Sequence, residues 1–116
     1  MKFLILLLPL LPAVSLADEV RIVDVRVECP QTCTFMVTLE HADQGWNHYA
    51  NLWEEVTLTD QLLGARVLYH PHENEQPFTR SLSGVSIPAG LRQVKVRARD
   101  SLHGYAENEV VVDLPN

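Results

Sequence analysis

All five histidines of the chain lie in three short polar segments, and imidazole is the side chain here with the most distinctive chemistry. The segments are EHADQGWNHY (40–49), YHPHENE (69–75) and ARDSLHGY (98–105). Neutral imidazole is the commonest protein ligand for zinc, copper and iron. A metal site needs three or four donors that converge on one ion. The segments can build such a site only if the fold brings them together.

The primary candidate ligands are His41, His48 and His103. Each stands at the tip of a segment that we expect to be a β-strand, so the flanking strand would hold the imidazole in place. Asp100 lies three residues before His103. We expect it to act as a fourth ligand or to orient an imidazole through a hydrogen bond.

The pair His70 and His72 is a secondary candidate. The two residues flank Pro71, and alternate residues of an extended chain point to opposite faces. We therefore expect at most one of them to point toward the site. The same segments carry acidic residues that we expect to be solvated loop charges: Glu40, Asp43, Glu73 and Glu75.

Apolar and polar residues alternate with a period of two along most of the chain after residue 17, which is typical of β-strands. Seven strands are predicted, over 20–29, 32–41, 47–58, 62–70, 78–87, 91–100 and 107–114. Seven short strands with Trp53 in the third predict an all-β fold, an immunoglobulin-like seven-stranded antiparallel sandwich. Another small β-sandwich or a barrel is the alternative.

The order of the strands predicts where the histidines lie. If successive antiparallel strands reverse direction, the second, fourth and sixth strands end at the same end of the sandwich. The third strand begins there. All five histidines then share one end, and the turn between the first two strands lies at the other.

That turn carries the two cysteines, Cys29 and Cys33, in the sequence CPQTC. We expect them to form a disulfide, because the chain carries an export signal and oxidising compartments preserve disulfides. A metal bound by the two thiolates is the alternative.

Residues 1–17, MKFLILLLPLLPAVSLA, have the charged start, apolar run and small-residue cleavage signal of a secretory peptide. The apolar run of about 15 residues is shorter than the ~20 that a membrane span needs. An uncleaved anchor is the alternative. We expect one mature domain over residues 18–116 in the periplasm or outside the cell. No cysteine stands at the expected cleavage point, so a lipid anchor is not expected.

The chain is acidic, with a net charge of −6 at pH 7. Loss of Lys2 with the signal would make the mature charge −7, which is −6 minus 1. Such a surface repels phosphates, so nucleic acid and anionic membranes are not expected as partners. It suits a cationic ligand or a basic protein, although solubility also accounts for it.

The order and spacing of several residues resemble the iron-binding domain of superoxide reductases, the desulfoferrodoxin and neelaredoxin family. These residues are His41, His48-Tyr49, Trp53, Asp100 and His103-Gly104. The resemblance implies an immunoglobulin-like sandwich in which His41, His48 and His103 bind iron. The family's axial cysteine falls where this chain has Asp100. The resemblance therefore implies a site of nitrogen and oxygen donors and argues against superoxide reductase activity.

A second segment, HPHENEQPFTRSLSG, resembles the sandwich subunit that partners the sulfur carrier in thiosulfate oxidation. That subunit is a non-catalytic binding module. The resemblance implies a protein-contact surface formed by Pro71, Pro77, Phe78 and Arg80.

The sequence contains no Gly-rich phosphate loop, no HExxH and no GxSxG motif. The function predicted is an exported sandwich that binds one transition metal (copper, iron or zinc), with a redox, carrier or structural role for the metal left open. The alternative is a metal-free interaction module for a periplasmic redox or sulfur-carrier complex. The sequence does not indicate an oligomeric state.

Overall fold

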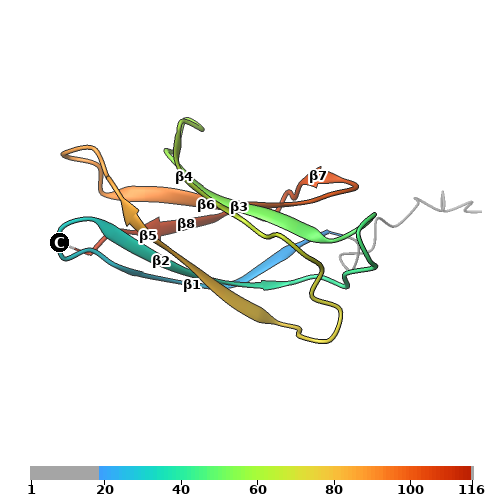
Figure 1. Cartoon of the computed structure of the whole chain (residues 1–116). Helices are drawn as coiled ribbons and strands as arrows, with labels where there is room; N and C mark the ends of the chain where they lie inside the picture. Colours follow the sequence, from blue (N-terminus) through green and yellow to red (C-terminus); the bar gives the residue numbers. More distant parts are fainter. Residues whose placement is uncertain (1–18, 116) are drawn as a thin grey trace, which may run out of the picture.

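The computed structural model describes residues 19–115 of the chain, which form eight β-strands (Figure 1). The strands are β1 (Arg21–Glu28), β2 (Cys33–Glu40), β3 (Ala50–Val56), β4 (Leu62–Val67), β5 (Phe78–Val85), β6 (Gln93–Asp100), β7 (Gly104–Tyr105) and β8 (Val110–Asp113). Within this described range, no helix is long and apolar enough to cross a membrane. The predicted signal peptide, residues 1–17, lies outside the described residues.

The strands form two antiparallel sheets packed as a sandwich, which appear as two layers in Figure 1. One sheet has the strand order β1-β2-β5, and the other has the order β4-β3-β6-β7 with β8 also paired to β6. The predicted all-β antiparallel sandwich is thus confirmed. Its immunoglobulin-like character stays a prediction.

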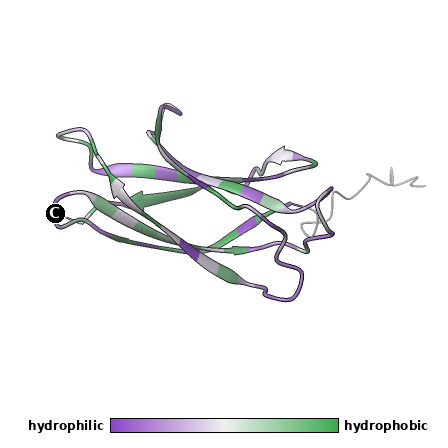
Figure 2. Cartoon of the chain, viewed as in Figure 1, coloured by the Kyte–Doolittle hydropathy of each residue, from purple (hydrophilic) through white to green (hydrophobic). Residues whose placement is uncertain are grey.

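The core lies between the sheets because apolar residues alternate along the strands and face inward. Buried positions alternate with more exposed ones in β2 and β6. They are Phe35, Val37 and Leu39 in β2, and Val94, Val96 and Ala98 in β6. Trp53 of β3 is fully buried in the same cluster. Figure 2 shows apolar residues along the strands and polar residues in the loops at the right-hand end.

The first six strands are where the sequence predicts them, and the last differs. The segment expected as one strand over 107–114 contributes only β8, and the short β7 precedes it along the same side of β6. Between them, Ala106 still donates its backbone N–H to the carbonyl of Ala98. Asn108 is not part of either strand, and its side-chain oxygen accepts a hydrogen bond from the backbone N–H of Ile22 in β1. One edge of the sheet is therefore formed by two short strands.

The turn between β1 and β2 holds the disulfide Cys29–Cys33, which confirms the predicted pairing. In Figure 1 this turn lies at the left-hand end of the sandwich. The loops that carry the histidines lie at the right-hand end.

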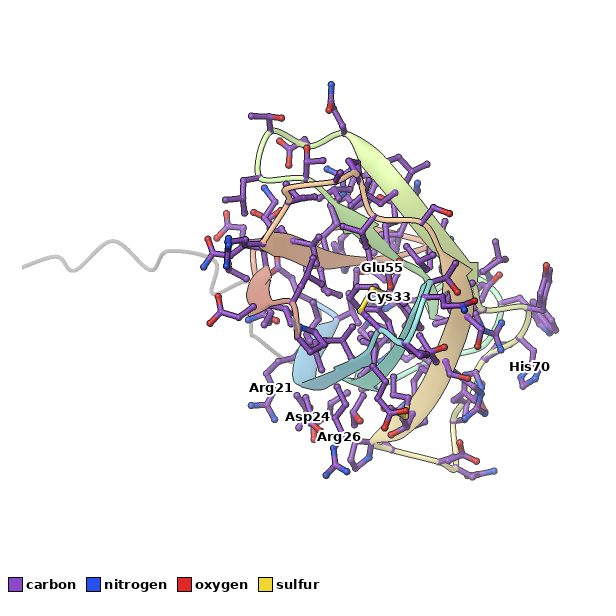
Figure 3. All side chains as sticks on the ribbon, turned by 90° about the vertical axis from the view of Figure 1, so that its left-hand side faces the viewer. Arg21, Asp24, Arg26, Cys33, Glu55 and His70 are labelled. Atoms are coloured by element: carbon purple, nitrogen blue, oxygen red, sulfur yellow. A yellow bond between two sulfur atoms is a disulfide. The ribbon has the colours of Figure 1, made fainter. Side chains whose placement is uncertain are left out.

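The ionisable side chain of Glu55, in β3, is fully buried between the sheets. Glu55 pairs with Gly64 of β4, and a Cβ placed on Gly64 would be 3.0 Å from the Glu55 carboxyl. The glycine thus makes room for that carboxyl. Figure 3 shows Glu55 and Cys33 inside the sandwich, whereas the labelled charged residues of β1 point outward. Burial raises the pKa of Glu55 to about 8, and the nearby charge of Glu54 adds to the rise.

Candidate metal centre

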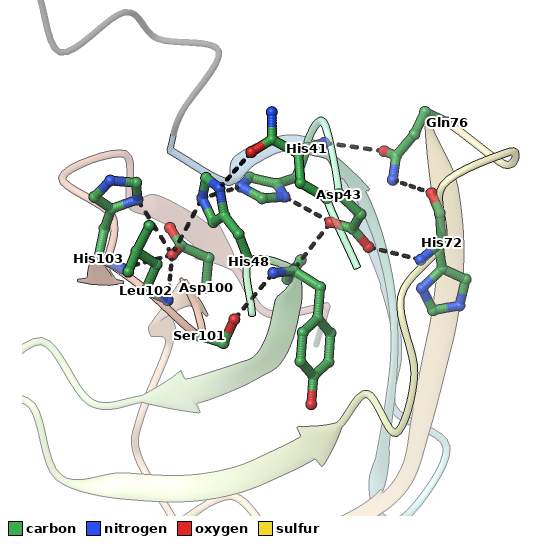
Figure 4. A network of polar contacts seen from close by, with 12 residues as sticks. His41, Asp43, His48, His72, Gln76, Asp100, Ser101, Leu102 and His103 are labelled. Atoms are coloured by element: carbon green, nitrogen blue, oxygen red, sulfur yellow. Dashed lines mark hydrogen bonds and ion pairs between the residues drawn. The ribbon is translucent and has the colours of Figure 1, made fainter. Parts of the chain in front are cut away.

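Three loops meet at the end of the sandwich opposite the disulfide, as the predicted strand directions require. The loop 41–49 joins β2 to β3, the loop 68–77 joins β4 to β5, and the turn 101–103 joins β6 to β7. Figure 4 shows their polar side chains in one network. Residues far apart in the sequence therefore become neighbours because antiparallel strands end side by side.

The centre of this network is a pair of imidazoles, His41 and His48. Their Nε2 atoms are 3.2 Å apart, and their rings meet edge to face with centroids 4.7 Å apart. Both residues are buried. Two ligand atoms bound about 2.05 Å from a tetrahedral ion lie about 3.3 Å apart. The spacing of the two nitrogens therefore matches one edge of a tetrahedral site.

The outer nitrogen of each ring has a hydrogen-bond acceptor. His41 Nδ1 lies 2.6 Å from a carboxyl oxygen of Asp43, and His48 Nδ1 lies 3.3 Å from the amide oxygen of Gln44. When both Nδ1 atoms donate to these acceptors, both Nε2 atoms present lone pairs to each other. A proton or a cation between them relieves that repulsion, and this is how metal-binding histidines are oriented.

Asp100, at the end of β6, supplies an oxygen to the same place. Its Oδ1 lies 3.6 Å from His48 Nε2 and accepts hydrogen bonds from the backbone N–H groups of Leu102 and His103 at 2.9 and 2.6 Å. The second oxygen, Oδ2, is buried and has no hydrogen-bond partner in the described part of the chain. Buried carboxyl oxygens are normally hydrogen-bonded, paired with a charge or bound to a metal.

Asp43 corrects an expectation, because it is not a solvated loop charge. Its side chain is fully buried, and its oxygens accept hydrogen bonds from the His41 ring and from the backbone N–H groups of Ala50 and His72. Burial alone would raise its pKa. The hydrogen bonds from His41, His72 and Ala50 outweigh that effect, so the pKa of Asp43 is lowered. Asp43 thus stays a carboxylate and holds three segments together.

Sequence reasoning missed the role of Asp43, although a signal was present. His41 and Asp43 are two residues apart, and a carboxylate that accepts from the outer nitrogen of a histidine is a common companion of metal ligands. Gln44 was missed as well, because a glutamine in a polar loop carries no distinctive signal.

His103 was predicted as one of three ligands, and the structure places it at the edge of the centre. Its Nδ1 is 3.3 Å from Asp100 Oδ1, and its ring lies 4.8 Å, centroid to centroid, from that of His48. The group whose donor atoms all lie within 4.8 Å of one another consists of His41, His48 and Asp100. Asp100 therefore takes the inner position that was expected for His103.

Of the secondary pair, only His72 is buried, and His70 is exposed. Their rings lie 4.6 Å apart, centroid to centroid, so the two side chains do not point to opposite faces as expected from alternation. The His72 ring stacks on Phe78 with centroids 4.0 Å apart, and its Nε2 lies 3.0 Å from an Arg80 nitrogen. Burial and the Arg80 charge lower the pKa of His72. His72 joins the network through its backbone N–H and not through its ring.

The residues proposed for partner contact have different surroundings. Phe78 is 2% exposed and belongs to the core, so its side chain is not available to a partner. Its apolar ring is buried against His72 at the start of β5. Arg80 is partly exposed and pairs with Glu75. Pro77 is the last residue of the loop 68–77 and is exposed, whereas Pro71 lies within the loop and is half-buried.

His41, His48 and Asp100 are thus close enough to hold a metal ion. Two imidazole nitrogens and a carboxylate form a three-donor set that leaves further coordination positions for water or another ligand. Asp100 ends β6, His41 directly follows β2, and His48 lies two residues before β3, so both sheets contribute to the site.

Among curated proteins, the chain is similar to a protein named "Putative lipoprotein" from Halomicrobium mukohataei. The two are 40% identical over 97 residues, which cover 82% of this chain and 47% of that protein. The chain thus spans about half the length of this relative. No protein-family model matches the chain, and no solved structure matches it.

Proposed function

We propose that this is an exported protein that binds one divalent transition-metal ion through His41, His48 and Asp100. The observation that carries the proposal is the convergence of two Nε2 atoms, 3.2 Å apart, beside a buried carboxyl group. One oxygen of that carboxyl has no hydrogen-bond partner among residues 19–115. Asp43 supports it, because it fixes the ring of His41 in the orientation that a metal ligand needs.

The donor set favours copper, zinc or iron. Nitrogen and oxygen donors suit Cu(II), Zn(II) and Fe(II), and the usual order of affinities predicts that Cu(II) binds most tightly. The resemblance to superoxide reductases makes iron an ion to test. The oxygen of Asp100 at the place of that family's cysteine favours metal binding over superoxide reduction.

Export is supported by two observations. The disulfide Cys29–Cys33 belongs in an oxidising compartment. The similar protein from Halomicrobium mukohataei is named as a lipoprotein, a class of exported proteins. Together they favour a periplasmic or secreted location.

A metal-free interaction module is the second candidate, and a separate observation favours it. Trp46 and residues 70–75 line a pocket of about 580 Å³ beside the network. Trp46 is mostly exposed, as is Tyr69 next to the pocket. Such a surface fits a protein partner, and the function would then rest on this loop and not on the buried imidazoles.

The test is metal titration of the protein purified without a histidine tag, followed by metal analysis. Cu(II), Zn(II) and, without oxygen, Fe(II) are added to the metal-free wild type and to His48→Gln. His70→Gln is the matched control, because it removes an exposed histidine at the same end. We expect about one equivalent in the wild type and in the control, and loss in His48→Gln. Failure of the wild type to bind, or equal binding by His48→Gln, would favour the interaction module.

A further inference from the structure

We propose that His103 is the exchange ligand of this centre, the imidazole that takes an ion from solvent and passes it to His41, His48 and Asp100. The inference rests on the proposed function. It gives His103 a role in the rates of metal uptake and release that is separate from that of the three buried donors.

The first observation is a gradient of exposure. The side chains of His41 and Asp100 are 0% and 1% exposed, that of His48 is 9% exposed, and that of His103 is 38% exposed. A hydrated ion in solvent therefore meets His103 before it meets the others. The three inner donors can bind the ion only after it has lost most of its water.

The second observation is contact with two of the three inner donors. The Nδ1 of His103 lies 3.3 Å from Asp100 Oδ1, and its ring lies edge-on to that of His48. Figure 4 shows Asp100 between the two imidazoles. An ion held by His103 is thus already next to Asp100 and His48. It can gain an inner ligand before it gives up the outer one.

The third observation is that the backbone of His103 is anchored and its ring is not enclosed. The backbone N–H donates to Asp100 Oδ1 at 2.6 Å, and Gly104 follows with a positive φ of 78° that closes the turn. Rotation about the side-chain bonds of a partly exposed residue is fast, so the ring can swing between solvent and the site. The anchor keeps each swing directed at the same place.

Stepwise exchange lowers the barrier, because water ligands are replaced one at a time and are not all lost at once. Removal of the His103 ring should then slow both uptake and release. An ordinary ligand behaves differently, since its loss mainly speeds release. The direction of the two rate changes distinguishes the roles.

A competing route lies on the other side of His41. A pocket of about 610 Å³ there is lined by His41 and by acidic residues that include Glu40 and Glu73. The side chain of His41 is closed to solvent, and its Nδ1 is occupied by Asp43. Entry by that route would not depend on His103, so the experiment separates the two.

The experiment is stopped-flow measurement of Cu(II) uptake, and of Cu(II) release to excess EDTA, in the wild type, His103→Ala and His70→Ala. Equilibrium binding by the wild type is established first, because its absence would refute the proposed function itself. We expect His103→Ala to slow both steps by about tenfold or more, with a smaller change in Kd. His70→Ala should match the wild type. Backbone anchoring is kept in His103→Ala, and unchanged thermal unfolding would verify the fold.

Two results would overturn the inference while leaving the proposed function intact. Unchanged rates in His103→Ala would mean that the ion enters elsewhere. Faster release with unchanged uptake would make His103 a simple fourth ligand.

Discussion

Asp43 and His41 are joined by a 2.6 Å hydrogen bond between two side chains that are both closed to solvent. The remaining acceptor capacity of Asp43 goes to the backbone of Ala50 and of His72. One carboxylate thus orients a proposed metal ligand and ties the loop 41–49 to β3 and to the loop 68–77. Function and local stability meet at this residue.

Replacement of Asp43 by asparagine should lower both the stability of the fold and the affinity for metal. The amide nitrogen that replaces one oxygen would face a backbone N–H, so one donor loses its acceptor. We expect a loss of about 1–3 kcal/mol in the free energy of unfolding. Metal affinity should fall by about 10–100-fold. Chemical denaturation and metal titration measure the two effects. Asp24→Asn, at an exposed position of β1, is the control, and equal effects in the two variants would refute the role given to Asp43.

Most of the fold could be predicted from the sequence, because alternation of apolar residues is a local signal that each strand carries by itself. Val94, Val96 and Ala98 illustrate this, since these alternate residues of the predicted strand 91–100 are all buried. The split of the last strand was not predictable. It depends on a hydrogen bond between Asn108 and Ile22, 86 positions apart in the sequence.

The sequence was sufficient to predict which end of the sandwich holds the site and that the histidines gather there. Strand direction alone places His41, His48 and Asp100 together, because it is a property of topology. Which of Asp100 and His103 lies inside depends on how the turn 101–103 folds. There Asp100 binds the backbone N–H groups that follow it, and the turn carries the His103 ring outward. No residue pattern encodes that choice.

Two substitutions at Asp100 should separate its structural and metal-binding roles. Asparagine keeps an oxygen that can accept from Leu102 and His103 but loses the negative charge. We expect Asp100→Asn to unfold close to the wild type and to bind metal at least about tenfold more weakly. Asp100→Ala removes the acceptor too, and should also lower the free energy of unfolding by about 1–3 kcal/mol. Thermal unfolding and metal titration on the same samples distinguish the two roles. Tight metal binding by Asp100→Asn would contradict the proposal that Asp100 is a metal ligand.

Glu55 should make the stability of the protein depend on pH. Its pKa is raised to about 8 in the folded state, whereas it is near 4.5 when unperturbed. Between these values the folded state holds a proton that the unfolded state has released. The contribution of Glu55 is therefore most favourable below about pH 4.5 and is lost as the pH rises through about 8.

The variant Glu55→Gln cannot ionise and should flatten this dependence. Denaturant unfolding at pH 5 and pH 9 should show a smaller loss of stability in the variant than in the wild type. Glu75→Gln, in the exposed loop, should keep the wild-type difference. An unchanged difference in Glu55→Gln would mean that the carboxyl group is hydrated in the folded protein.

The disulfide should contribute to stability without influence on the metal centre, because the two lie at opposite ends of the sandwich (Figure 1). A loop closed by cysteines four positions apart constrains the unfolded chain by only about 2 kcal/mol. We expect Cys29→Ala/Cys33→Ala to lose about that amount and to bind metal with unchanged Kd. A large change in Kd would show that the two ends are coupled.

X-ray absorption spectroscopy of the metal-loaded protein identifies the atoms bound to the ion. We expect two imidazole nitrogens and at least one oxygen at about 2.0–2.2 Å, and no sulfur. We also expect one imidazole to disappear from the spectrum of His41→Gln. An ion bound through sulfur, or a spectrum unchanged in His41→Gln, would contradict the assignment of the site.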